Sequence, residues 1–302
     1  MTISDFGPKL ANNDSSVPAS LTESFRAVVL AHYGELGRDL PWRRTRDPYS
    51  ILVSEVMLQQ TQVARVLPKY DLFLSLFPEP RALATAPLGA VLVAWQGLGY
   101  NRRALALHRA AQIVTSEHQG RIPRSVPELR RLPAIGPATA AAVCVFAYGH
   151  PLTFIETNIR SAFLHYFFRE CIAVPDADIL PLIEVTLDRE NPRDWYYALM
   201  DYGAWVKKTQ HNPGRRSRHH ATQTPFVGSR RQLRAQVLQL LLAANTVYRP
   251  PDQAGTDIAT SQDAASIMAQ LPTWDPQEAQ AVLSELAAEG FLVVKAGRYR
   301  IA

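Results

Sequence analysis

Two carboxylates in this chain stand in settings that suit chemistry on a glycosidic bond. Glu55 is the one charged residue between Pro48 and Val63, in a run whose apolar residues fit a helix face. A carboxyl group in apolar surroundings has a raised pKa, which suits a general acid near neutral pH. Glu156 follows an apolar run and precedes Asn158, where a new helix is expected to begin. Breaking a glycosidic bond needs one group to protonate the leaving group and one to stabilise an oxocarbenium-like centre. A solvated glutamate at 55 and a plain helix cap at 156 are the alternatives.

The segment Leu132-Pro-Ala-Ile-Gly136-Pro-Ala-Thr139-Ala is typical of a helix-hairpin-helix element. A helix ends, a tight turn contains a glycine, and Pro137 opens the next helix, where its missing N–H costs nothing. The new helix exposes its first N–H groups to an anion, and Gly136 lets a phosphate approach the backbone. The pattern predicts a sequence-independent grip on a DNA backbone, with an ordinary helix–helix turn as the alternative.

The composition is that of a globular protein. The chain has 302 residues, of which 47% are hydrophobic, and its formal charge is +5. This length predicts two units. No apolar run approaches the ~20 residues of a membrane span, and the polar N-terminus has no hydrophobic signal core. We therefore expect a cytoplasmic, nucleoid-associated protein with no membrane partner.

The positive charge is unevenly spread. No Asp or Glu occurs between Tyr202 and Pro251. The nine basic residues there are Lys207, Lys208, Arg215, Arg216, Arg218, Arg230, Arg231, Arg234 and Arg249. A block of one sign is an electrostatic footprint for a polyanion such as nucleic acid, although a solvated linker fits the charge equally well.

The elements that must position these residues are expected to be nearly all helical. Residues 1–19 are predicted to be a disordered lead, and Ser20-Leu-Thr-Glu23 a capping box that starts the first helix. Helical segments then continue to about Gly203, and Ser125-Val-Pro-Glu128 is a second capping box. Residues 20–205 are therefore predicted to be an all-α domain.

The C-terminal part changes character. Residues 206–229 lose the helical period and are predicted to be a basic connector. In residues 230–302, an amphipathic helix from Arg230 precedes two more helices at Asp263–Leu271 and Asp275–Gly290, and two short strands flank Ala296-Gly297. This is the pattern of a winged-helix-like α+β module, which binds DNA or protein.

Six motifs occur in order over about residues 22–205: LPW (40–42), DPY (47–49), SEVMLQQTQV (54–63), GLGY (97–100), LPAIGPATA (132–140) and ETN (156–158). Together they resemble the helix-hairpin-helix DNA glycosylases of the HhH-GPD superfamily, and within it the adenine DNA glycosylases of the MutY type. The resemblance implies a two-subdomain, all-α glycosylase fold with a six-helix part at about 48–155. It also implies double-stranded DNA with a mispair or damaged base as the partner. The target base must leave the stack, which is easier at a mispair.

The resemblance also implies roles for single residues. Glu55 matches the acid that protonates the flipped adenine, Glu156 the carboxylate that stabilises the sugar cation, and Asn158 a neighbouring site asparagine. The base pocket and the duplex wedge would be formed by Leu58, Gln59, Gln60, Tyr100 and Ala138. The backbone of Ile135, Gly136 and Thr139 would hold phosphate, and the hairpin can also hold a monovalent cation.

Several departures from the family pattern change these expectations. The second carboxylate is normally Asp, whereas here it is Glu156, one methylene longer. Ala138 stands where bifunctional relatives carry a Schiff-base lysine, so we expect a monofunctional enzyme. Adenine-specific members often have Tyr at this position, so Ala138 also leaves room for another target base.

Two features common in the family, the cysteines of an iron–sulfur cluster and a Nudix-related domain, are not found in this sequence. Four cysteines for a [4Fe–4S] cluster normally follow Asp201-Tyr-Gly203, but this chain holds only Cys144 and Cys171. We expect no cluster, no required cofactor and no metal ligands. The cluster loop's DNA contacts would pass to Lys207, Lys208, Arg215, Arg216 and Arg218. Residues 230–302 stand in place of the usual Nudix-related domain, which reads 8-oxoguanine.

The expected activity is that of a monomeric, monofunctional DNA glycosylase. It would hydrolyse the N-glycosidic bond of a flipped base, with adenine opposite 8-oxoguanine or guanine as the first choice. A mismatch glycosylase for thymine, uracil or another modified base is the alternative. A catalytically inactive DNA-binding protein is the second alternative, and excision of a defined base separates all three.

Overall fold

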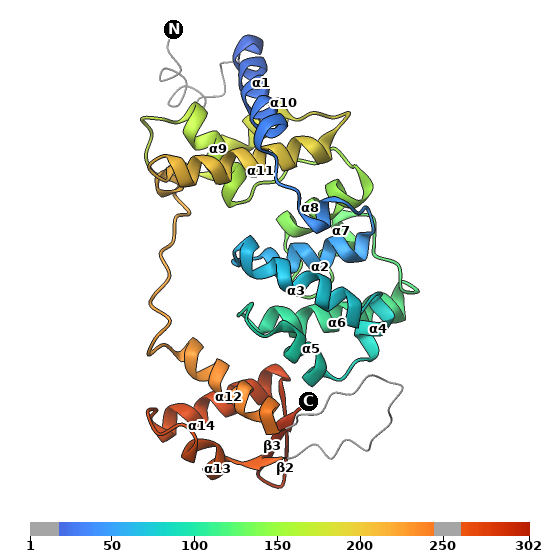
Figure 1. The fold of residues 1–302 in the computed structure, drawn as a ribbon, viewed down its shortest axis with the longest axis vertical. Coiled ribbons are helices and arrows are strands. Elements are labelled where there is room, and N and C mark those ends of the chain that lie inside the picture. Colours follow the sequence, from blue (N-terminus) through green and yellow to red (C-terminus); the bar gives the residue numbers. More distant parts are fainter. Residues whose placement is uncertain (1–17, 245–260) are drawn as a thin grey trace. The chain divides into compact units, whose positions relative to one another are not determined.

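The computed structural model describes residues 18–244 and 261–302, which form two compact units (Figure 1). Unit 1 takes its described residues from Met1–Glu55, Pro123–Arg131 and Ile135–Thr222. Unit 2 takes them from Val56–Ile122, Leu132–Ala134 and Gln223–Ala302. The disordered lead expected at 1–19 lies, except for its last two residues, outside the described residues. Each unit therefore combines segments that are far apart in the sequence.

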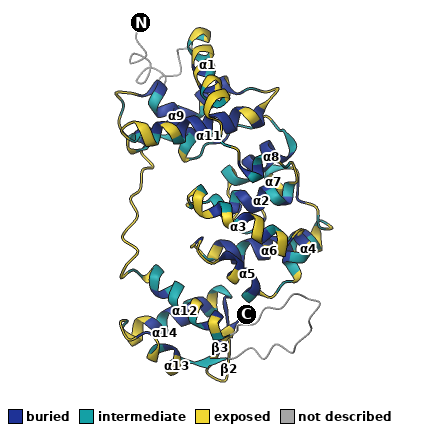
Figure 2. Cartoon of the chain, viewed as in Figure 1, coloured by how far each residue is buried: buried dark blue, intermediate teal, exposed yellow. Residues whose placement is uncertain are grey.

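Unit 1 is helical. Its elements are α1 (Ala19–Leu36), η3 (Pro41–Arg43), α2 (Pro48–Leu58) as far as Glu55, α7 (Val126–Leu129), α8 (Pro137–Tyr148), α9 (Thr157–Phe167), α10 (Asp176–Thr186), α11 (Pro192–Thr209) and η4 (Pro213–Arg216). Aromatic side chains fill its core. The ring centroid of Phe25 lies 4.9 Å from that of Phe163 and 6.1 Å from that of Trp195. These contacts join α1, α9 and α11, whose inward faces are buried (Figure 2).

The two predicted capping boxes have different outcomes. The first is wrong, because α1 begins at Ala19 after Pro18, and Ser20 lies inside the first turn, where its carbonyl accepts the Ser24 hydroxyl. The φ of Pro18 is already −56°, and its carbonyl accepts the first helical N–H bonds. The second is confirmed, because Ser125 caps α7 and accepts a hydrogen bond from the backbone N–H of Glu128.

The connector is shorter than predicted. α11 continues through Val206 to Thr209, so the first four residues of the expected connector are helical. Val206 is fully buried, and this anchors the last turn of the helix. After η4, Ser217 forms an isolated parallel bridge with Val174. The segment to Ser217 is therefore part of unit 1, and the extended part of the connector begins later.

Unit 2 contains four helices within residues 63–117 and the C-terminal module. Its elements are α3 (Val63–Leu76), α4 (Pro80–Thr85), α5 (Leu88–Trp95), α6 (Arg102–Glu117), α12 (Arg230–Ala244), β1 (Gln262–Asp263), α13 (Ala264–Ala269), α14 (Pro276–Glu289), β2 (Leu292–Lys295) and β3 (Arg298–Ile301). Over 18–244 and 261–302, no helix has both the length and the hydropathy needed to cross a membrane.

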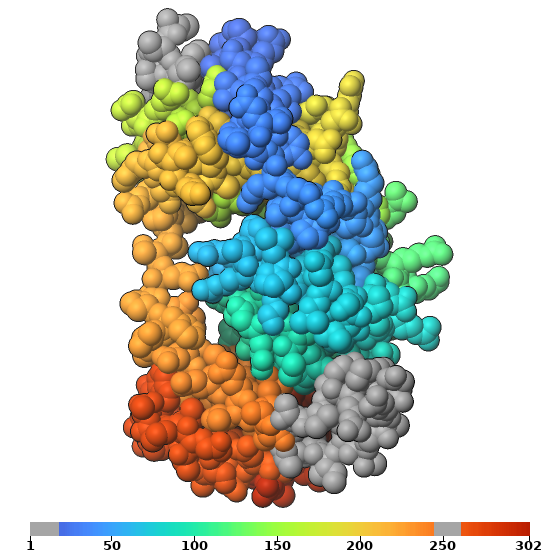
Figure 3. Space-filling model, in the orientation of Figure 1, coloured from blue at the N-terminus to red at the C-terminus, as the bar shows by residue number. Residues whose placement is uncertain are grey.

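The C-terminal module has the predicted three helices and hairpin. β2 and β3 pair antiparallel, with Lys295 opposite Arg298, and Ala296 and Gly297 turn the chain with positive φ. β1 adds a third strand that the sequence did not predict, in the order β1-β3-β2. It is only two residues long, too short for a period-2 pattern. α12 and α14 pack together within this module (orange and red in Figure 3).

Candidate active site

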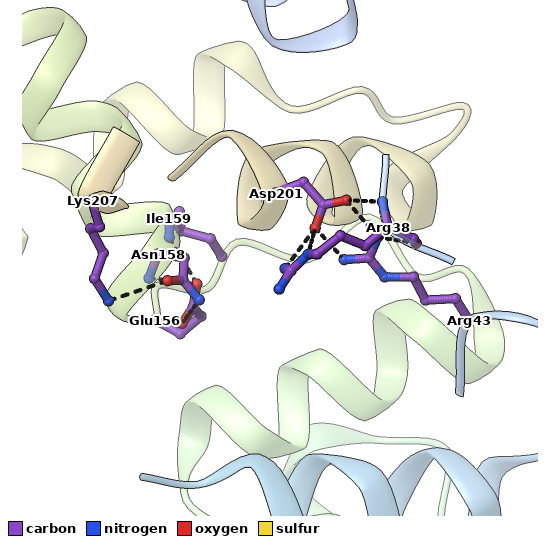
Figure 4. Close-up of polar contacts among 7 residues, drawn as sticks. All are labelled: Arg38, Arg43, Glu156, Asn158, Ile159, Asp201 and Lys207. Atoms are coloured by element: carbon purple, nitrogen blue, oxygen red, sulfur yellow. Dashed lines mark hydrogen bonds and ion pairs between the residues drawn. The ribbon is translucent and has the colours of Figure 1, made fainter. Parts of the chain in front are cut away.

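Glu156 caps the N-terminus of α9 with its own carboxylate. Its Oε1 accepts hydrogen bonds from the backbone N–H groups of Asn158 (2.7 Å) and Ile159 (2.8 Å) (Figure 4). Its Oε2 accepts one from the Asn158 side-chain amide (3.3 Å). The helix dipole at this end favours a negative charge. The cap therefore holds an acceptor carboxylate in one place, and the longer side chain of Glu compared with Asp folds back onto its own helix.

Glu55 lies on α2 in an apolar setting, as the sequence indicated. It is partly buried, and its neighbours Ile51 and Leu52 are fully buried. Burial raises the pKa of Glu55 to about 8, the negative charge of Glu156 acts in the same direction, and Arg43 opposes the rise. Glu55 is therefore protonated at neutral pH and can donate that proton.

The two carboxyl groups differ in how their charged forms are stabilised. Burial also raises the pKa of Glu156, but the two backbone N–H groups, Lys207 and Arg160 all lower it. The negative charge of Glu156 adds to the rise in the pKa of Glu55. Glu156 is therefore the carboxyl group whose charged form hydrogen bonds and nearby cations favour, and Glu55 is the one whose surroundings favour the protonated form. This is the division of roles that glycosidic bond cleavage requires.

A buried ion cluster fixes Arg43, the cation that faces Glu55. The carboxylate of Asp201 accepts hydrogen bonds from both terminal nitrogens of Arg43 (2.7 and 2.8 Å) and from the backbone N–H (2.8 Å) and Nε (2.6 Å) of Arg38 (Figure 4). Burial alone would raise the pKa of Asp201, but the Arg43 and Arg38 hydrogen bonds hold it below its ordinary value. The sequence did not reveal this cluster, because 163 residues separate Arg38 from Asp201.

Gly203 lets α11 approach the start of α9. A Cβ added at Gly203 would lie 1.9 Å from the carbonyl oxygen of Asn158, closer than any side chain tolerates. The absence of a side chain at this one position therefore sets the distance between α11 and the residues that bear the Glu156 cap. This close packing also lets Lys207, one turn further along α11, reach Asn158.

The hairpin glycine has the geometry predicted for it. Gly136 is exposed and is the N-cap residue of α8, with φ −75° and ψ 172°, and Pro137 opens the helix. A Cβ at Gly136 would meet nothing within 4 Å. Ile135 is buried, whereas Ala138 and Thr139 are partly exposed in the first turn of α8. Neither backbone conformation nor packing requires a glycine at 136.

In unit 2, Arg103 ties together the two segments predicted to line the pocket and wedge the duplex. Its buried guanidinium donates to the carbonyls of residues 56, 57 and 59 (2.5 to 2.9 Å) and to those of residues 98 (3.3 Å) and 99 (3.1 Å). It also lies 5.4 Å from the ring centroid of Tyr100. Leu58 ends α2, and Gln60 and Tyr100 have positive φ values of 54° and 50°. Arg103 thus stabilises two strained turns, a role that the sequence pattern did not predict.

Replacing Arg103 with methionine is expected to lower the free energy of unfolding by about 3 kcal/mol or more, because five carbonyls, three of them in buried hydrogen bonds, lose a donor. Urea unfolding followed by circular dichroism measures this. The adjacent Arg102→Met is the matched control: its exposed ion pair with Glu289 is worth at most about 1 kcal/mol. Equal losses in the two variants would contradict the role given to Arg103.

The five predicted DNA-contacting basic residues have different environments. Lys208, Arg215 and Arg218 are exposed, as a backbone contact would require. Arg216 instead donates its guanidinium to the carbonyls of Leu164 and Arg169, which gives it an internal role in unit 1. Lys207 is partly buried and donates to Asn158 Oδ1 at 3.4 Å, so it faces the start of α9.

The described residues do not fit an iron–sulfur cluster. Among residues 18–244 and 261–302, no group of three or more His, Cys, Asp or Glu side chains could hold a metal ion. Cys144 is buried in α8, where its Sγ donates to the Arg124 carbonyl and burial raises its pKa to about 11. The sequence after α11, where the cluster ligands would be expected, contains no cysteine.

Comparisons with known proteins agree with this geometry. The family model of the HhH-GPD superfamily base excision DNA repair proteins matches residues 53–201. The chain is 35% identical over 261 residues to the adenine DNA glycosylase of Mycobacterium tuberculosis (strain ATCC 25618 / H37Rv), covering 78% of this chain and 84% of that protein. It is 32% identical over 243 residues to the adenine DNA glycosylase of Homo sapiens, covering 76% of this chain and 43% of that protein. Among solved structures, a thermostable thymine-DNA glycosylase is similar with a TM-score of 0.55 and 27% identity, covering 61% of this chain and 87% of that one.

Proposed function

This chain belongs to the HhH-GPD superfamily of base excision DNA repair proteins, and from that membership we propose that it is a monofunctional adenine DNA glycosylase. The observation that carries the proposal is the catalytic pair. Burial raises the pKa of Glu55 to about 8, and Glu156 accepts hydrogen bonds from the backbone N–H groups of Asn158 and Ile159. The similarity to adenine DNA glycosylases from bacteria and mammals supports adenine as the base that is removed.

In the proposed reaction, Glu55 donates its proton to the flipped adenine as the bond from the sugar to the base breaks. The bonding electrons leave with the base, and positive charge develops on the sugar. The carboxylate of Glu156 stabilises that charge, because its oxygens are already oriented by α9 and Asn158. Water then adds to the anomeric carbon, its proton passes to the Glu55 carboxylate, and an abasic site is left.

The exposed hairpin is the proposed grip on the DNA backbone. The N-terminus of α8, where the helix dipole favours an anion, and the absence of a Cβ at Gly136 leave room for a phosphate. Lys208, Arg215 and Arg218 would add sequence-independent attraction. Such a contact does not require a protein-bound metal, although a monovalent cation at the hairpin fits the proposal.

Replacing Gly136 with alanine tests this grip. We expect the variant to fold normally, with a change in unfolding free energy of less than about 1 kcal/mol, because its Cβ meets nothing. We expect its Kd for duplex DNA to rise about tenfold, because the methyl group occupies the phosphate position. Fluorescence anisotropy with an uncleavable duplex measures the Kd. An unchanged Kd would remove the hairpin from the DNA contact.

The enzyme is proposed to act as a monomer in the cytoplasm, at the nucleoid, without an iron–sulfur cluster. Ala138 at the hairpin supports a monofunctional reaction, because it offers no amine for a Schiff base. The two cysteines cannot supply the four thiolates that a cluster needs. Borohydride treatment during turnover should therefore trap no covalent protein–DNA adduct.

Single-turnover excision on labelled duplexes tests the proposed function. The panel contains adenine opposite 8-oxoguanine, adenine opposite guanine, thymine opposite guanine and uracil opposite guanine, each read by alkali cleavage. We expect cleavage of the adenine duplexes. Cleavage of thymine or uracil alone would favour the mismatch glycosylase, to which the similarity with a thymine-DNA glycosylase gives some support. Tight binding without any cleavage would leave the DNA-binding alternative.

A further inference from the structure

Lys207 and Lys208 are adjacent in the sequence but differ in environment. Lys207 lies in the last turn of α11, is partly buried, and its Nζ is 3.4 Å from Asn158 Oδ1 (Figure 4). Lys208 is exposed in the same turn. The difference follows from the helix geometry, because consecutive residues point about 100° apart. Only the first of the two lysines is directed at the start of α9.

The contact with Lys207 determines which way the Asn158 amide faces. A lysine ammonium can only donate hydrogen bonds, so it selects the oxygen end of the amide. The nitrogen end then faces Glu156, where Nδ2 donates to Oε2 at 3.3 Å. Without the lysine, the amide could rotate and present its oxygen to the Glu156 carboxylate, which would be repulsive. Lys207 thus supports one of the three hydrogen bonds that Glu156 accepts.

The charges around Glu156 give Lys207 a second effect. The carboxyl group of Glu55, on α2, lies in the electric fields of both Glu156 and Arg43: the negative Glu156 raises its pKa and the positive Arg43 lowers it. Arg160 on α9 and Lys207 on α11 are the cations that favour the charged form of Glu156. Arg160 is matched by Asp176, to which it donates two hydrogen bonds of 2.7 Å. The charge of Lys207 is therefore the one directed mainly at the catalytic pair.

We propose that Lys207 is a positioning residue of the active site, which orients the Asn158 amide and through it the Glu156 carboxyl group. This inference rests on the proposed function and reassigns Lys207 from the DNA backbone to the chemical step. Lys207 lies in the segment where the iron–sulfur cluster ligands of the family would be expected. The proposal therefore gives this segment a role in the active site.

The test compares Lys207→Met with the matched control Lys208→Met. Single-turnover excision of the preferred adenine duplex is measured at saturating protein from pH 5 to 9. We expect Lys207→Met to lower the maximal rate by roughly 10–100-fold, because the carboxylate loses its orientation. We also expect the acid limb of its pH profile to move up by about one unit, because Glu156 then protonates more easily. Lys207→Arg should restore the position of the acid limb.

The control should behave differently. Lys208→Met is expected to weaken binding to an uncleavable duplex, with a smaller salt dependence, and to leave the acid limb of the pH profile in place. If the two methionine variants lose DNA affinity equally and keep the same pH profile, Lys207 is a backbone contact and the inference is overturned. A covalent adduct trapped at Lys207 by borohydride would overturn it as well, because the lysine would then be a nucleophile.

A measurement without DNA separates this inference from the proposed function. Carbon-13 NMR titration of the Glu156 carboxyl in the free protein should give a higher pKa in Lys207→Met than in the unchanged protein or in Lys208→Met. Failure of the unchanged protein to cleave any duplex would defeat the proposed function alone. An identical Glu156 titration in all three proteins would defeat the role of Lys207, whatever the substrate is.

Discussion

Replacing Glu55 with glutamine is expected to reduce single-turnover excision by about 10³-fold, because the glutamine amide has no proton to give to the leaving base. The unchanged protein should lose activity about tenfold per pH unit above about pH 8, the pKa to which burial and Glu156 raise Glu55. Rates measured from pH 6 to 10 on the preferred adenine duplex check both statements. A variant within tenfold of the unchanged protein would exclude Glu55 as the acid.

The same substitution is expected to stabilise the fold at alkaline pH. The folded protein holds the Glu55 proton to about pH 8, whereas the unfolded chain releases it near 4.5, so stability is lost as the pH rises through that window. Glutamine does not ionise, and at pH 9 the gain should be about 2 kcal/mol after allowance for partial exposure to water. The difference should vanish near pH 4. Glu117→Gln, at the exposed end of α6, is the control and should change neither rate nor stability.

Replacing Gly203 with alanine is expected to cost about 3 kcal/mol or more of unfolding free energy. The new Cβ would overlap the backbone of Asn158, which cannot rotate away as a flexible side chain could. α9 and α11 must separate, and the Glu156 carboxylate moves with the start of α9. Where the variant still folds, excision should fall by about 10²-fold, since a shift of about 1 Å in a catalytic group has that effect.

Gly34→Ala is the matched control for this variant. Gly34 is also a helical glycine, near the end of α1, but a Cβ there would meet nothing within 4 Å. We expect it to stabilise the protein by about 0.5 to 1 kcal/mol, because alanine is the better helix former. Urea unfolding of both variants gives the comparison. If Gly203→Ala matched Gly34→Ala in stability and activity, close packing at Gly203 would not be required.

The parts of the site that were predicted from the sequence depend on local signals. The isolated charge of Glu55 indicated its raised pKa, the Gly136-Pro137 pair indicated the start of α8, and the Ala296-Gly297 pair indicated the C-terminal hairpin. Each of these features is contained within a few residues. The residue types of a turn, or the apolar residues of a single helix, are therefore sufficient to predict these features.

The parts that were missed depend on distant residues. Asp201 is stabilised by Arg38 and Arg43, and Arg103 bonds the carbonyls of a turn more than 40 residues earlier in the chain. Lys207 was assigned to DNA with its neighbours, because its sequence shows only a run of basic residues. Its direction toward Asn158 follows from where α11 ends and from how closely Gly203 lets the two helices pack. No local sequence pattern predicts the end of α11 or the close packing of α11 against α9.

The packing of α1 against α9 and α11 has a consequence for how the protein is made. The ring of Phe25 contacts that of Phe163, which is synthesised 138 residues later. Because protein synthesis proceeds at about 5–20 residues per second, the ribosome takes roughly 7–30 s to add the residues between Phe25 and Phe163. For that time the apolar face of α1 has no partner to pack against. During that time Phe25 and Val29, both fully buried in the folded protein, face water on the nascent chain. During this interval the apolar face of α1 is available to a nascent-chain chaperone.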